Sequence, residues 1–490
     1  MRRFGFTFSK KKLLPTLLIV GLFVAFLYFP LFMQLGSLAL EPWDEALFAL
    51  RALYMYDTNE YMINFNQFEG GPDHMNTKLP FTTFFQVLGL YAFGVSELGV
   101  RAPIAIIFLL TTFYLVYFFK KTTDSFFIGI GFGALLVSSS GFMGFHMMRT
   151  ADQDVAFACY VLLSALFFYL FFITKKTKHL LFFTLFFLAG LLTKNLLVLL
   201  VVPGLFFFVL IKKELLSFLK DVRVYLCILV IIGVYISTIA YFEWQHPGFF
   251  DRMWNYELFG RYTQTIENHG GSFFHYLDLF FTDKFYPFSY LMILSLFFIF
   301  NKKTPSNHRA LLLLLFCLFL FYLLGVSYSK TKTSWYIAPL YPLAALIISL
   351  GLYHFYNSYL KKRLIGRLFF IVLCFAFIFP NYYSSVDTLY KKPPKAQEQI
   401  LGKYLKSLRK QGYLKEHTVL LDEGFGPSTI FTTEVYNRKY AFNLSRAADL
   451  NNLSGKTVLM CSKTLLSELE KNYTIRVLNE KEKCKLVKVY

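Results

Sequence analysis

Charged residues are scarce in this sequence, since only 16% of its 490 residues are Asp, Glu, Lys or Arg, against about 25% in an average soluble protein. Cysteine is scarcer still: the six cysteines occur singly, without a C-x-x-C pair or metal-ligand spacing. No internal repeat of the kind found in many transporters is present. These absences exclude a string of ordinary soluble domains and a cysteine-based metal centre. Cys461 and Cys484 could still form a disulfide in an oxidising compartment.

Apolar side chains are abundant instead. Hydrophobic residues make up 56% of the chain and aromatic residues 20%, with 61 Phe and 33 Tyr. A disordered or low-complexity chain does not carry so much apolar bulk. The composition therefore predicts a membrane protein that is ordered over most of its length.

The net charge is +20, which by itself is compatible with a nucleic-acid partner. The basic residues, however, lie between long apolar runs, and no nucleic-acid-binding motif accompanies them. This pattern marks cytoplasmic loops of a membrane protein, and we expect no nucleic acid as a partner. The clusters are Arg2-Arg3 with Lys10 to Lys12, Lys120-Lys121, Lys175-Lys176-Lys178, Lys212-Lys213 to Arg223, Lys302-Lys303-Arg309, and Lys361 to Arg363 with Arg367.

Long apolar runs predict about eleven crossings, since a bilayer core needs about 20 apolar residues in a helix. The N-terminus is placed inside, because the first run has no signal-peptidase cleavage site. The segment 79–94 is short, and counting it as a crossing would invert the later basic loops, so we expect a helix in the interface. The predicted spans are 13–35, 98–119, 126–146, 154–174, 180–194, 196–211, 224–243, 285–301, 310–328, 335–357 and 366–382.

The domain organisation follows from this pattern. Residues 1–384 are predicted to form the transmembrane domain, with a first outer loop at 36–97 and a second at 244–284, and 385–490 a small outer α/β domain. In the tail, apolar runs of strand length alternate with amphipathic stretches at 397–409 and 463–471. Pro393-Pro394 is the expected linker. The predicted strands are Thr418–Leu421, Thr457–Met460, Thr474–Val477 and Leu486–Val489.

Two carboxylates follow the first predicted span. Asp44 and Glu45 follow Pro42 closely, and Pro42 is a good helix start, so taken alone they are interpreted as complementing a helix N-terminus. Ionisable groups beside a membrane span are often functional, however. Lys78 lies at the start of the interfacial helix, where a lysine reaching for the headgroups is the plainer interpretation.

Further charged groups fall on the same outer face. A short turn holds Arg149, Asp152 and Asp154 close to the membrane, where an ion pair is favoured over a solvated turn. Lys194 interrupts an apolar stretch and needs a partner charge or a water-lined cavity. Surface-loop polarity is the simpler interpretation of most charges in the second loop. The remaining candidates are Arg261 in that loop, Lys330 and Lys332, which break the positive-inside pattern, and Tyr336.

Carboxylates next to cations suggest a reaction at a phosphate-linked substrate. Cations suit a phosphate or diphosphate, whereas a carboxylate can take the proton of a hydroxyl. The alternative is a transporter or flippase for a lipid-linked or anionic solute. Transporters tend to hold charges near the bilayer midplane, and only Lys194 is deep here, which favours an enzyme. A scaffold without activity is a third interpretation.

Six short motifs in order resemble the GT-C membrane glycosyltransferases, in particular the branch of the aminoarabinose lipid A transferase and the protein O-mannosyltransferases. The likeness covers roughly the first three-quarters of the chain. Its motifs are Asp44-Glu45, Lys78-Leu79-Pro80, Phe93-Gly94-Val95-Ser96-Glu97 with Arg101-Ala102-Pro103, Arg149 to Asp154, Leu192-Thr193-Lys194, and Ser329 to Lys332 with Tyr336-Ile337-Ala338-Pro339.

The resemblance implies a GT-C fold and transfer of a sugar from a polyprenyl-phosphate donor to a lipid, glycan or protein acceptor, with inversion at the anomeric carbon. It implies Asp44 as the base, with Glu45 and Asp154 as further catalytic candidates. Lys78 and Lys332 would contact the donor phosphate, with Arg149, Lys194, Arg261, Lys330 and Tyr336 as additional candidates. The active site and the tail would lie on the outer face of the cytoplasmic membrane, among its lipids.

The chain departs from the family pattern beside Lys78. Relatives often have an acidic residue immediately before this lysine, where Thr77 stands here, and Leu79 replaces a proline. In similar proteins that acid can join a histidine of the later outer loop at a metal, so His269 has no expected partner. We therefore expect neither a metal nor another cofactor.

Overall fold

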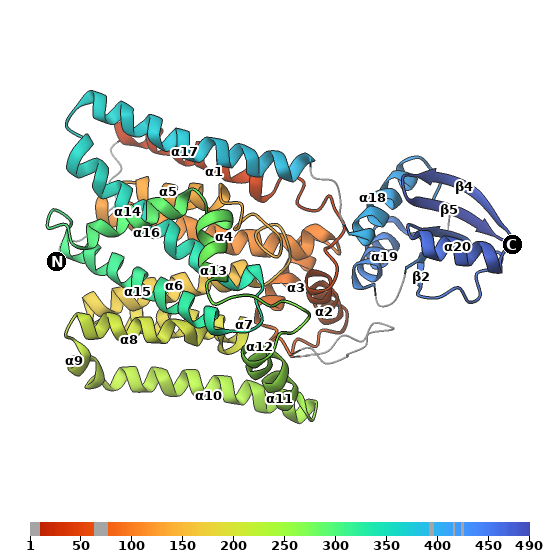
Figure 1. Ribbon diagram of the computed structural model, residues 1–490, viewed down its shortest axis with the longest axis horizontal. Helices are drawn as coiled ribbons and strands as arrows, with labels where there is room; N and C mark the ends of the chain where they lie inside the picture. The colour runs from red at the N-terminus through yellow and green to blue at the C-terminus, as the bar shows by residue number, and fades with distance from the viewer. Residues whose placement is uncertain (1–9, 63–76, 392–395, 415–416, 423–425) are drawn as a thin grey trace.

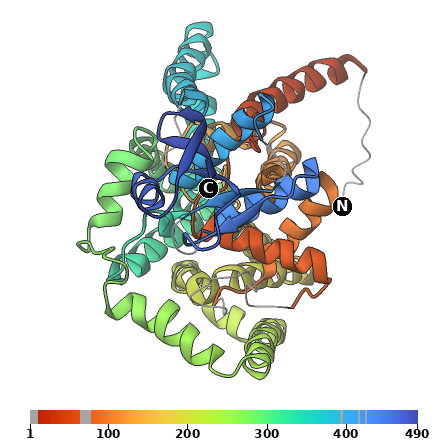
Figure 2. The same ribbon diagram turned by 90° about the vertical axis from the view of Figure 1, so that its right-hand side faces the viewer.

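The computed structural model describes residues 10–62, 77–391, 396–414, 417–422 and 426–490. It consists of a long helical bundle and a smaller C-terminal part that carries a β-sheet (Figure 1). An end-on view shows the sheet and its helices in front of the bundle (Figure 2). The predicted fold class, an all-α membrane protein with a small C-terminal α/β domain, is confirmed.

Among the described residues, eight helical segments are long and apolar enough to cross a membrane. The predicted spans at 126–146 and 285–301 correspond to shorter helices, and the interfacial helix predicted at 79–94 is α3, also short. The total of about eleven crossings therefore stays a prediction. The long segments are α1 (Lys10–Leu31), α4 (Glu97–Thr123), α6 (Asp154–Thr174), α7 (Thr177–Lys194) with η1 (Asn195–Val201) and α8 (Val202–Ile211), α10 (Val222–Gln245), α15 (Ser306–Tyr328), η5 (Ser334–Ile337) with α16 (Leu340–Phe355) and η6 (Tyr356–Leu360), and α17 (Leu364–Lys391); the shorter apolar helices are α3 (Phe81–Phe93), α5 (Phe127–Val137) and α14 (Phe288–Leu296) with η4 (Phe297–Ile299).

The apolar segment 177–211 is a hairpin of two helices. Its 35 residues would extend about 50 Å as one helix, well beyond a bilayer core. The two ends of the segment instead lie together, because Lys175 Nζ is 3.5 Å from the Glu214 carboxylate and Arg223 donates to the Lys175 carbonyl. The chain turns back at Lys194 and Asn195, where α7 ends. The predicted break at this point is confirmed.

The third predicted span, 126–146, is wrong in its second half, because α5 ends at Val137. The polar run that follows bonds to another loop: the hydroxyls of Ser139 and Ser140 and the N–H of Gly141 all donate to the Lys284 carbonyl. Gly141 also lies against Tyr341, and a Cβ there would come 2.5 Å from its hydroxyl oxygen. The loop 138–153 therefore starts inside the bundle.

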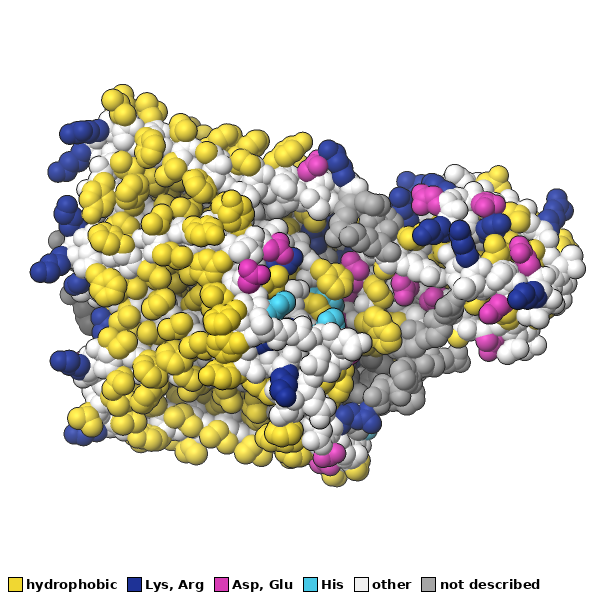
Figure 3. Space-filling model, in the orientation of Figure 1, with side chains coloured by type: hydrophobic (Ala, Val, Ile, Leu, Met, Phe, Trp, Pro, Cys, Tyr) yellow, Lys and Arg dark blue, Asp and Glu magenta, His cyan; other side chains and the backbone are white. Residues whose placement is uncertain are grey.

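The remaining elements of the helical part are short, and most belong to the outer loops. Helices α2 and α3 lie at the end of the bundle that faces the C-terminal part, together with α11 and α12, whereas α9 lies at the opposite end (Figure 1). Lys and Arg side chains gather at that opposite end (Figure 3). These elements are α2 (Asp44–Thr58), α9 (Leu215–Leu219), α11 (Phe249–Arg252), η2 (Met253–Gly260), α12 (Arg261–Thr263), α13 (His275–Asp278) and η3 (Leu279–Lys284).

The C-terminal part is a five-stranded mixed sheet with strand order β2-β1-β3-β5-β4. Strand β1 is parallel to β2 and β3, and β5 is antiparallel to β3 and β4. The four predicted strands and the two predicted helices are confirmed, whereas β2 and α19 were not predicted. The elements are α18 (Gln397–Lys410), β1 (Thr418–Leu421), α19 (Pro427–Tyr440), β2 (Ser445–Ala447), β3 (Thr457–Met460), α20 (Lys463–Asn472), β4 (Ile475–Lys481) and β5 (Cys484–Val489).

Two features connect this part to the predictions. Cys461, directly after β3, forms a disulfide with Cys484, the first residue of β5. Helix α17 continues to Lys391, so the predicted domain boundary at 384 falls inside a helix, and the linker Pro393-Pro394 lies outside the described residues.

The hydrophobic core of the C-terminal part also includes α2: Leu50 and Leu53 belong to one buried cluster with Leu405 and Phe431.

Candidate active site

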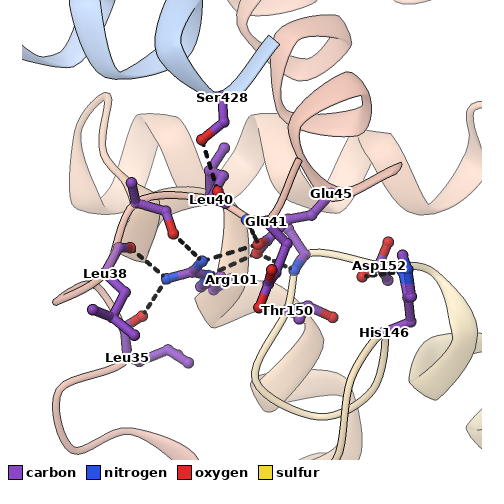
Figure 4. Close-up of polar contacts among 12 residues, drawn as sticks. Leu35, Leu38, Leu40, Glu41, Glu45, Arg101, His146, Thr150, Asp152 and Ser428 are labelled. Carbon is purple, nitrogen blue, oxygen red and sulfur yellow. Dashed lines mark hydrogen bonds and ion pairs between the residues drawn. The ribbon is translucent and has the colours of Figure 1, made fainter. Parts of the chain in front are cut away.

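The two predicted catalytic acids at the start of α2 lie in different surroundings. Glu45 is fully buried, and its carboxylate accepts hydrogen bonds from Arg101 Nε and a terminal guanidinium nitrogen at 2.7 and 2.9 Å. It also accepts from the backbone N–H groups of Glu41 and Ala151 (Figure 4). Asp44 is half-buried, and its side chain has no hydrogen bond or ion pair among the described residues. Only Asp44 has a carboxylate that is free to take a proton.

Arg101 fixes the chain that leads into α2. Besides Glu45, its guanidinium donates to the carbonyls of Leu35, Leu38 and Ala39 at 2.8 to 3.1 Å (Figure 4). All these groups are buried or nearly so, which makes each hydrogen bond costly to lose. Arg101 thus determines where α2 begins.

A histidine and an aspartate of the loop 138–153 lie beside Asp44. His146 Nδ1 is 3.1 Å from Asp152 Oδ2, and both side chains are buried. Burial alone would lower the pKa of His146, but the Asp152 carboxylate raises this pKa to about 9. Burial would raise the pKa of Asp152, and His146 lowers it below the ordinary value. At neutral pH the two form an ion pair.

Ligand atoms of Asp44, His146 and Asp152 lie within 4.8 Å of one another. One nitrogen and two carboxylate oxygens are a donor set that could hold a divalent cation. A metal binds the neutral imidazole, however, so it would have to displace the proton that Asp152 favours on His146. The expectation of no metal therefore stays a prediction.

Asp154 and Lys194 form a second buried ion pair. Asp154 is the first residue of α6, Lys194 is the last of α7, and Lys194 Nζ lies 2.9 Å from Asp154 Oδ2. Their side chains are 5% and 8% exposed, so each charge depends on the other. The partner that the sequence requires for Lys194 is thus Asp154.

Glu257 lies at the centre of a third group of charged side chains. It accepts from Lys78 Nζ at 2.5 Å and from the Thr77 hydroxyl at 2.9 Å, and Arg261 Nε is 3.4 Å away. Burial alone would raise the pKa of Glu257, but Lys78 and Arg261 lower it to about 2. Burial lowers the pKa of Lys78, although Glu257 opposes this. Arg261 also lies over the ring of Tyr336, 5.8 Å from its centroid.

These side chains surround one cavity of about 100 Å³. Lys78, Lys194, Arg261 and Tyr336 line it, together with Glu257. Both lysines are also within electrostatic range of Asp44. Four of the seven predicted phosphate-binding residues therefore lie around one space, with the free carboxylate nearby.

The other three predicted cations have different surroundings. Arg149 donates to the carbonyls of Pro30 and Met33 at 2.9 and 3.0 Å, which ties the end of α1 to the loop 138–153. Lys332 Nζ donates to the Ser327 carbonyl near the end of α15 at 2.6 Å. Lys330 is exposed. None of the three lines the cavity.

Sequence reasoning did not assign a role to Arg101, His146 or Glu257. Two of them had a feature in the sequence that could have identified them. Arg101 is a charge inside an apolar span, and Glu257 precedes Arg261 by one helical turn. His146 had been placed at the end of a span that the structure ends earlier. What the sequence did not show is which charges pair with which.

Three residues around the site have positive φ although they are not glycine. Trp43, directly before Asp44, has φ 68° and ψ −112°; His146 has φ 57°, and Asn195, directly after Lys194, has φ 56°. His and Asn tolerate the left-handed region better than most residues, but a bulky residue there is strained. The strained Trp43 indicates that the surroundings fix the backbone at Asp44.

Comparisons with known proteins agree with this architecture. A model of the dolichyl-phosphate-mannose-protein mannosyltransferase family matches residues 76–242. The crystal structure of ArnT from Cupriavidus metallidurans bound to undecaprenyl phosphate is similar over 96% of this chain and 98% of that chain, with a TM-score of 0.64 and 15% identity. The chain has the GT-C fold. The predicted resemblance to GT-C membrane glycosyltransferases is thus confirmed at the level of the fold.

A second GT-C structure is similar over a smaller share of its length. The archaeal oligosaccharyltransferase AglB from Archaeoglobus fulgidus, in complex with an inhibitory peptide and a dolichol-phosphate, matches with a TM-score of 0.54 and 12% identity. The match covers 86% of this chain and 64% of that chain. No curated protein sequence matches significantly. With its long apolar helices and GT-C fold, the chain is an integral membrane protein.

Proposed function

We propose that this protein transfers a sugar from a polyprenyl-phosphate donor to a hydroxyl or amide acceptor of a lipid, glycan or protein. The observation that carries the proposal is the cavity lined by Lys78, Lys194 and Arg261, with the free carboxylate of Asp44 within electrostatic range of both lysines. The ArnT structure with undecaprenyl phosphate and the AglB structure with a dolichol-phosphate support a donor of this class.

The charge balance of the cavity suits a phosphate. Lys78, Lys194 and Arg261 carry three positive charges, and their ion-pair partners Glu257 and Asp154 carry two negative ones, so one positive charge is left in excess, with the Asp44 carboxylate within electrostatic range. A phosphate that displaces Glu257 from Lys78 would gain charge-assisted hydrogen bonds in a site with little water. Tyr336 adds a hydroxyl group to the lining.

The reaction would be a single in-line displacement. The acceptor oxygen or nitrogen attacks the anomeric carbon as Asp44 takes its proton, the bond between that carbon and the phosphate oxygen breaks, and polyprenyl phosphate leaves. The cations stabilise the negative charge that develops on the leaving phosphate. One displacement inverts the anomeric configuration. In this proposal Glu45 and Asp154 hold Arg101 and Lys194 in place and do not transfer protons.

The proposal places the reaction on the outer face of the cytoplasmic membrane. Arg261, which lines the cavity, begins α12, and α12 lies at the end of the bundle that faces the C-terminal part (Figure 1). Lys and Arg side chains gather at the opposite end (Figure 3). The Cys461–Cys484 disulfide supports an oxidising compartment for the C-terminal part. A reporter fused after Tyr490 should therefore be active only outside the cytoplasm.

The test is incubation of the purified protein in vesicles with a panel of polyprenyl-phosphate sugars and membrane extracts, followed by mass analysis of lipid, glycan and protein products. The expected result is a sugar-bearing product and free polyprenyl phosphate, both lost in Asp44→Asn. Movement of a lipid-linked sugar between leaflets without a covalent product would contradict the proposal and indicate a flippase.

A further inference from the structure

The C-terminal part touches the chain directly before Asp44. The Ser428 hydroxyl, in the first turn of α19, donates to the Leu40 carbonyl at 2.7 Å, and both residues are fully buried (Figure 4). Leu40 is four residues from Asp44, and the residues before it, Leu38 and Ala39, are those bound by Arg101. The same short segment is therefore fixed from two sides, by the membrane part and by the C-terminal part.

A second contact fixes this segment by shape. A Cβ built on Gly402 of α18 would lie 2.7 Å from the Ala39 Cβ. Real Cβ atoms essentially never come so close, so a side chain at position 402 would force the backbones of α18 and Ala39 apart. Helix α18 thus approaches Ala39 as closely as a glycine permits.

The start of α19 is itself held by the sheet. Asp422, directly after β1, accepts a hydrogen bond from the Thr429 hydroxyl at 2.7 Å, and Arg446 of β2 lies 3.9 Å from the same carboxylate oxygen. Both the donor Thr429 and the acceptor Asp422 are buried. The position of Ser428 is therefore set by the folded sheet of the C-terminal part.

On the other side, the segment leads to the catalytic groups by short steps. The Glu41 N–H donates to Glu45, and Glu45 also accepts from the Ala151 N–H in the loop that carries Asp152. A shift of about 1 Å in a positioning element can cost a hundredfold in rate. The backbone at Trp43 is strained, and strain persists only where surrounding contacts over-determine the conformation.

From these contacts we infer that Ser428 is a positioning residue for Asp44, and that the C-terminal part completes the active site of the membrane part. The inference rests on the proposed function for the catalytic role of Asp44. The position of the segment 38–44, however, can be measured whether or not Asp44 is the base. Removal of the Ser428 hydroxyl leaves the buried Leu40 carbonyl without this donor. The segment 38–44 then loses its hydrogen bond to α19, and we expect α19 to stay folded.

The chain offers a matched control in the same helix. Thr433 is also buried, but its hydroxyl donates to the Thr429 carbonyl within α19. Thr433→Ala removes a buried hydroxyl and a similar hydrogen bond without touching the segment before Asp44. Gly402→Ala is a second variant, which pushes on Ala39 without removing the Ser428 hydroxyl.

The experiment uses the full chain in vesicles and measures two quantities for each variant. The first is kcat and KM for the polyprenyl-phosphate donor, and the second is hydrogen exchange of the backbone amides in 38–47 and in the strands. Ser428→Ala and Gly402→Ala should each lower kcat by about tenfold or more, leave the donor KM nearly unchanged, and speed exchange in 38–47 but not in the strands. Thr433→Ala should leave kcat and exchange in 38–47 as in the wild type.

Equal kcat values in Ser428→Ala and Thr433→Ala, or unchanged exchange in 38–47, would overturn the inference. Faster exchange in the strands of Ser428→Ala would indicate unfolding of the C-terminal part, and Gly402→Ala alone would then decide. If the wild type transfers no sugar from any donor, the proposed function fails, and the exchange of 38–47 in the variants still decides whether Ser428 positions this segment.

Discussion

Arg101 donates two hydrogen bonds to Glu45, at 2.7 and 2.9 Å, and so assigns the two neighbouring acids of α2 to different tasks. Glu45 is bound on both carboxylate oxygens, whereas Asp44, one residue earlier, has no hydrogen bond among the described residues. Successive helix residues point about 100° apart, so one of a pair can face the core while the other faces a cavity. In the proposed function, the acid pair therefore combines a structural residue, Glu45, with a reactive residue, Asp44.

Glu45→Ala should destabilise the protein strongly. The substitution leaves the Arg101 charge buried with carbonyl partners only, and loss of one member of a buried ion pair costs about 3–5 kcal/mol. Thermal unfolding in detergent, followed by aggregation or by intrinsic fluorescence, measures this loss. An unfolding temperature equal to that of the wild type would contradict the structural role.

Asp44→Asn should have the opposite profile. Removal of a general base lowers the rate by about 10²–10⁴-fold, but Asp44 makes no hydrogen bond whose loss would lower stability. The transfer assay and the same unfolding measurement together test this prediction. Full transfer activity in a well-folded Asp44→Asn protein would show that Asp44 is not the base.

Lys78→Ala should weaken use of the donor. The variant loses a cation of the cavity and leaves Glu257 with Arg261 and Thr77 as its remaining partners, so a donor phosphate would meet a less positive site. The donor KM should rise by about tenfold or more, as expected for loss of a charge-assisted hydrogen bond. Lys330→Ala is the control, because Lys330 is exposed and does not line the cavity; equal effects of the two variants would argue against the phosphate site.

The ion pair of His146 and Asp152 makes stability depend on pH. The pKa of His146 is raised to about 9, above the value of about 6.5 for an unfolded chain, so its stabilisation is complete below pH 6.5 and is lost as the pH rises through 9. We expect the unfolding temperature to fall between pH 6.5 and 9. The unfolding temperature of the His146→Gln variant should fall less over the same pH range. Parallel curves of unfolding temperature against pH for the two proteins would contradict the assignment of this pH dependence to His146.

Transfer should persist in the presence of a chelator. A metal at this site would have to displace the proton that Asp152 favours on His146, because the Asp152 carboxylate raises the pKa of His146 to about 9. The activity of chelator-treated protein, with and without added Mg²⁺, Mn²⁺ or Zn²⁺, tests this prediction. A loss on chelation that one cation restores would instead identify Asp44, His146 and Asp152 as a metal site.

The sequence predicts much of the fold because apolar length and basic clusters are local signals. It correctly predicted the break at Lys194-Asn195 and four strands of the tail, and it left open the Cys461–Cys484 disulfide that the structure contains. It failed at α5, where the serine run before Gly141 forms tertiary bonds to Lys284 instead of continuing a helix. It also did not predict α19, whose Thr-rich, weakly amphipathic sequence resembles neither a span nor an interfacial helix.

The site was predicted in composition but not in pairing. Charges on the outer face were sufficient to select Lys78, Lys194 and Arg261, which line the cavity, and Asp44, which lies within electrostatic range of both lysines. The partners of Lys78 and Lys194 are 179 and 40 residues away along the chain, and distances of this kind have no signature in a single sequence. Arg149, Lys330 and Lys332, which do not line the cavity, also lie near the outer ends of apolar spans, so the sequence around them does not distinguish them from the cations that do.

The positive φ angles of Trp43, His146 and Asn195 have a consequence for engineering. Glycine adopts such a conformation at no steric cost, so Trp43→Gly would relieve strain in the native state. The same change would loosen the residue next to Asp44. A search for heat-resistant variants would thus favour substitution at Trp43 and, under the proposed function, select slower enzymes, so thermostability and turnover should be screened together.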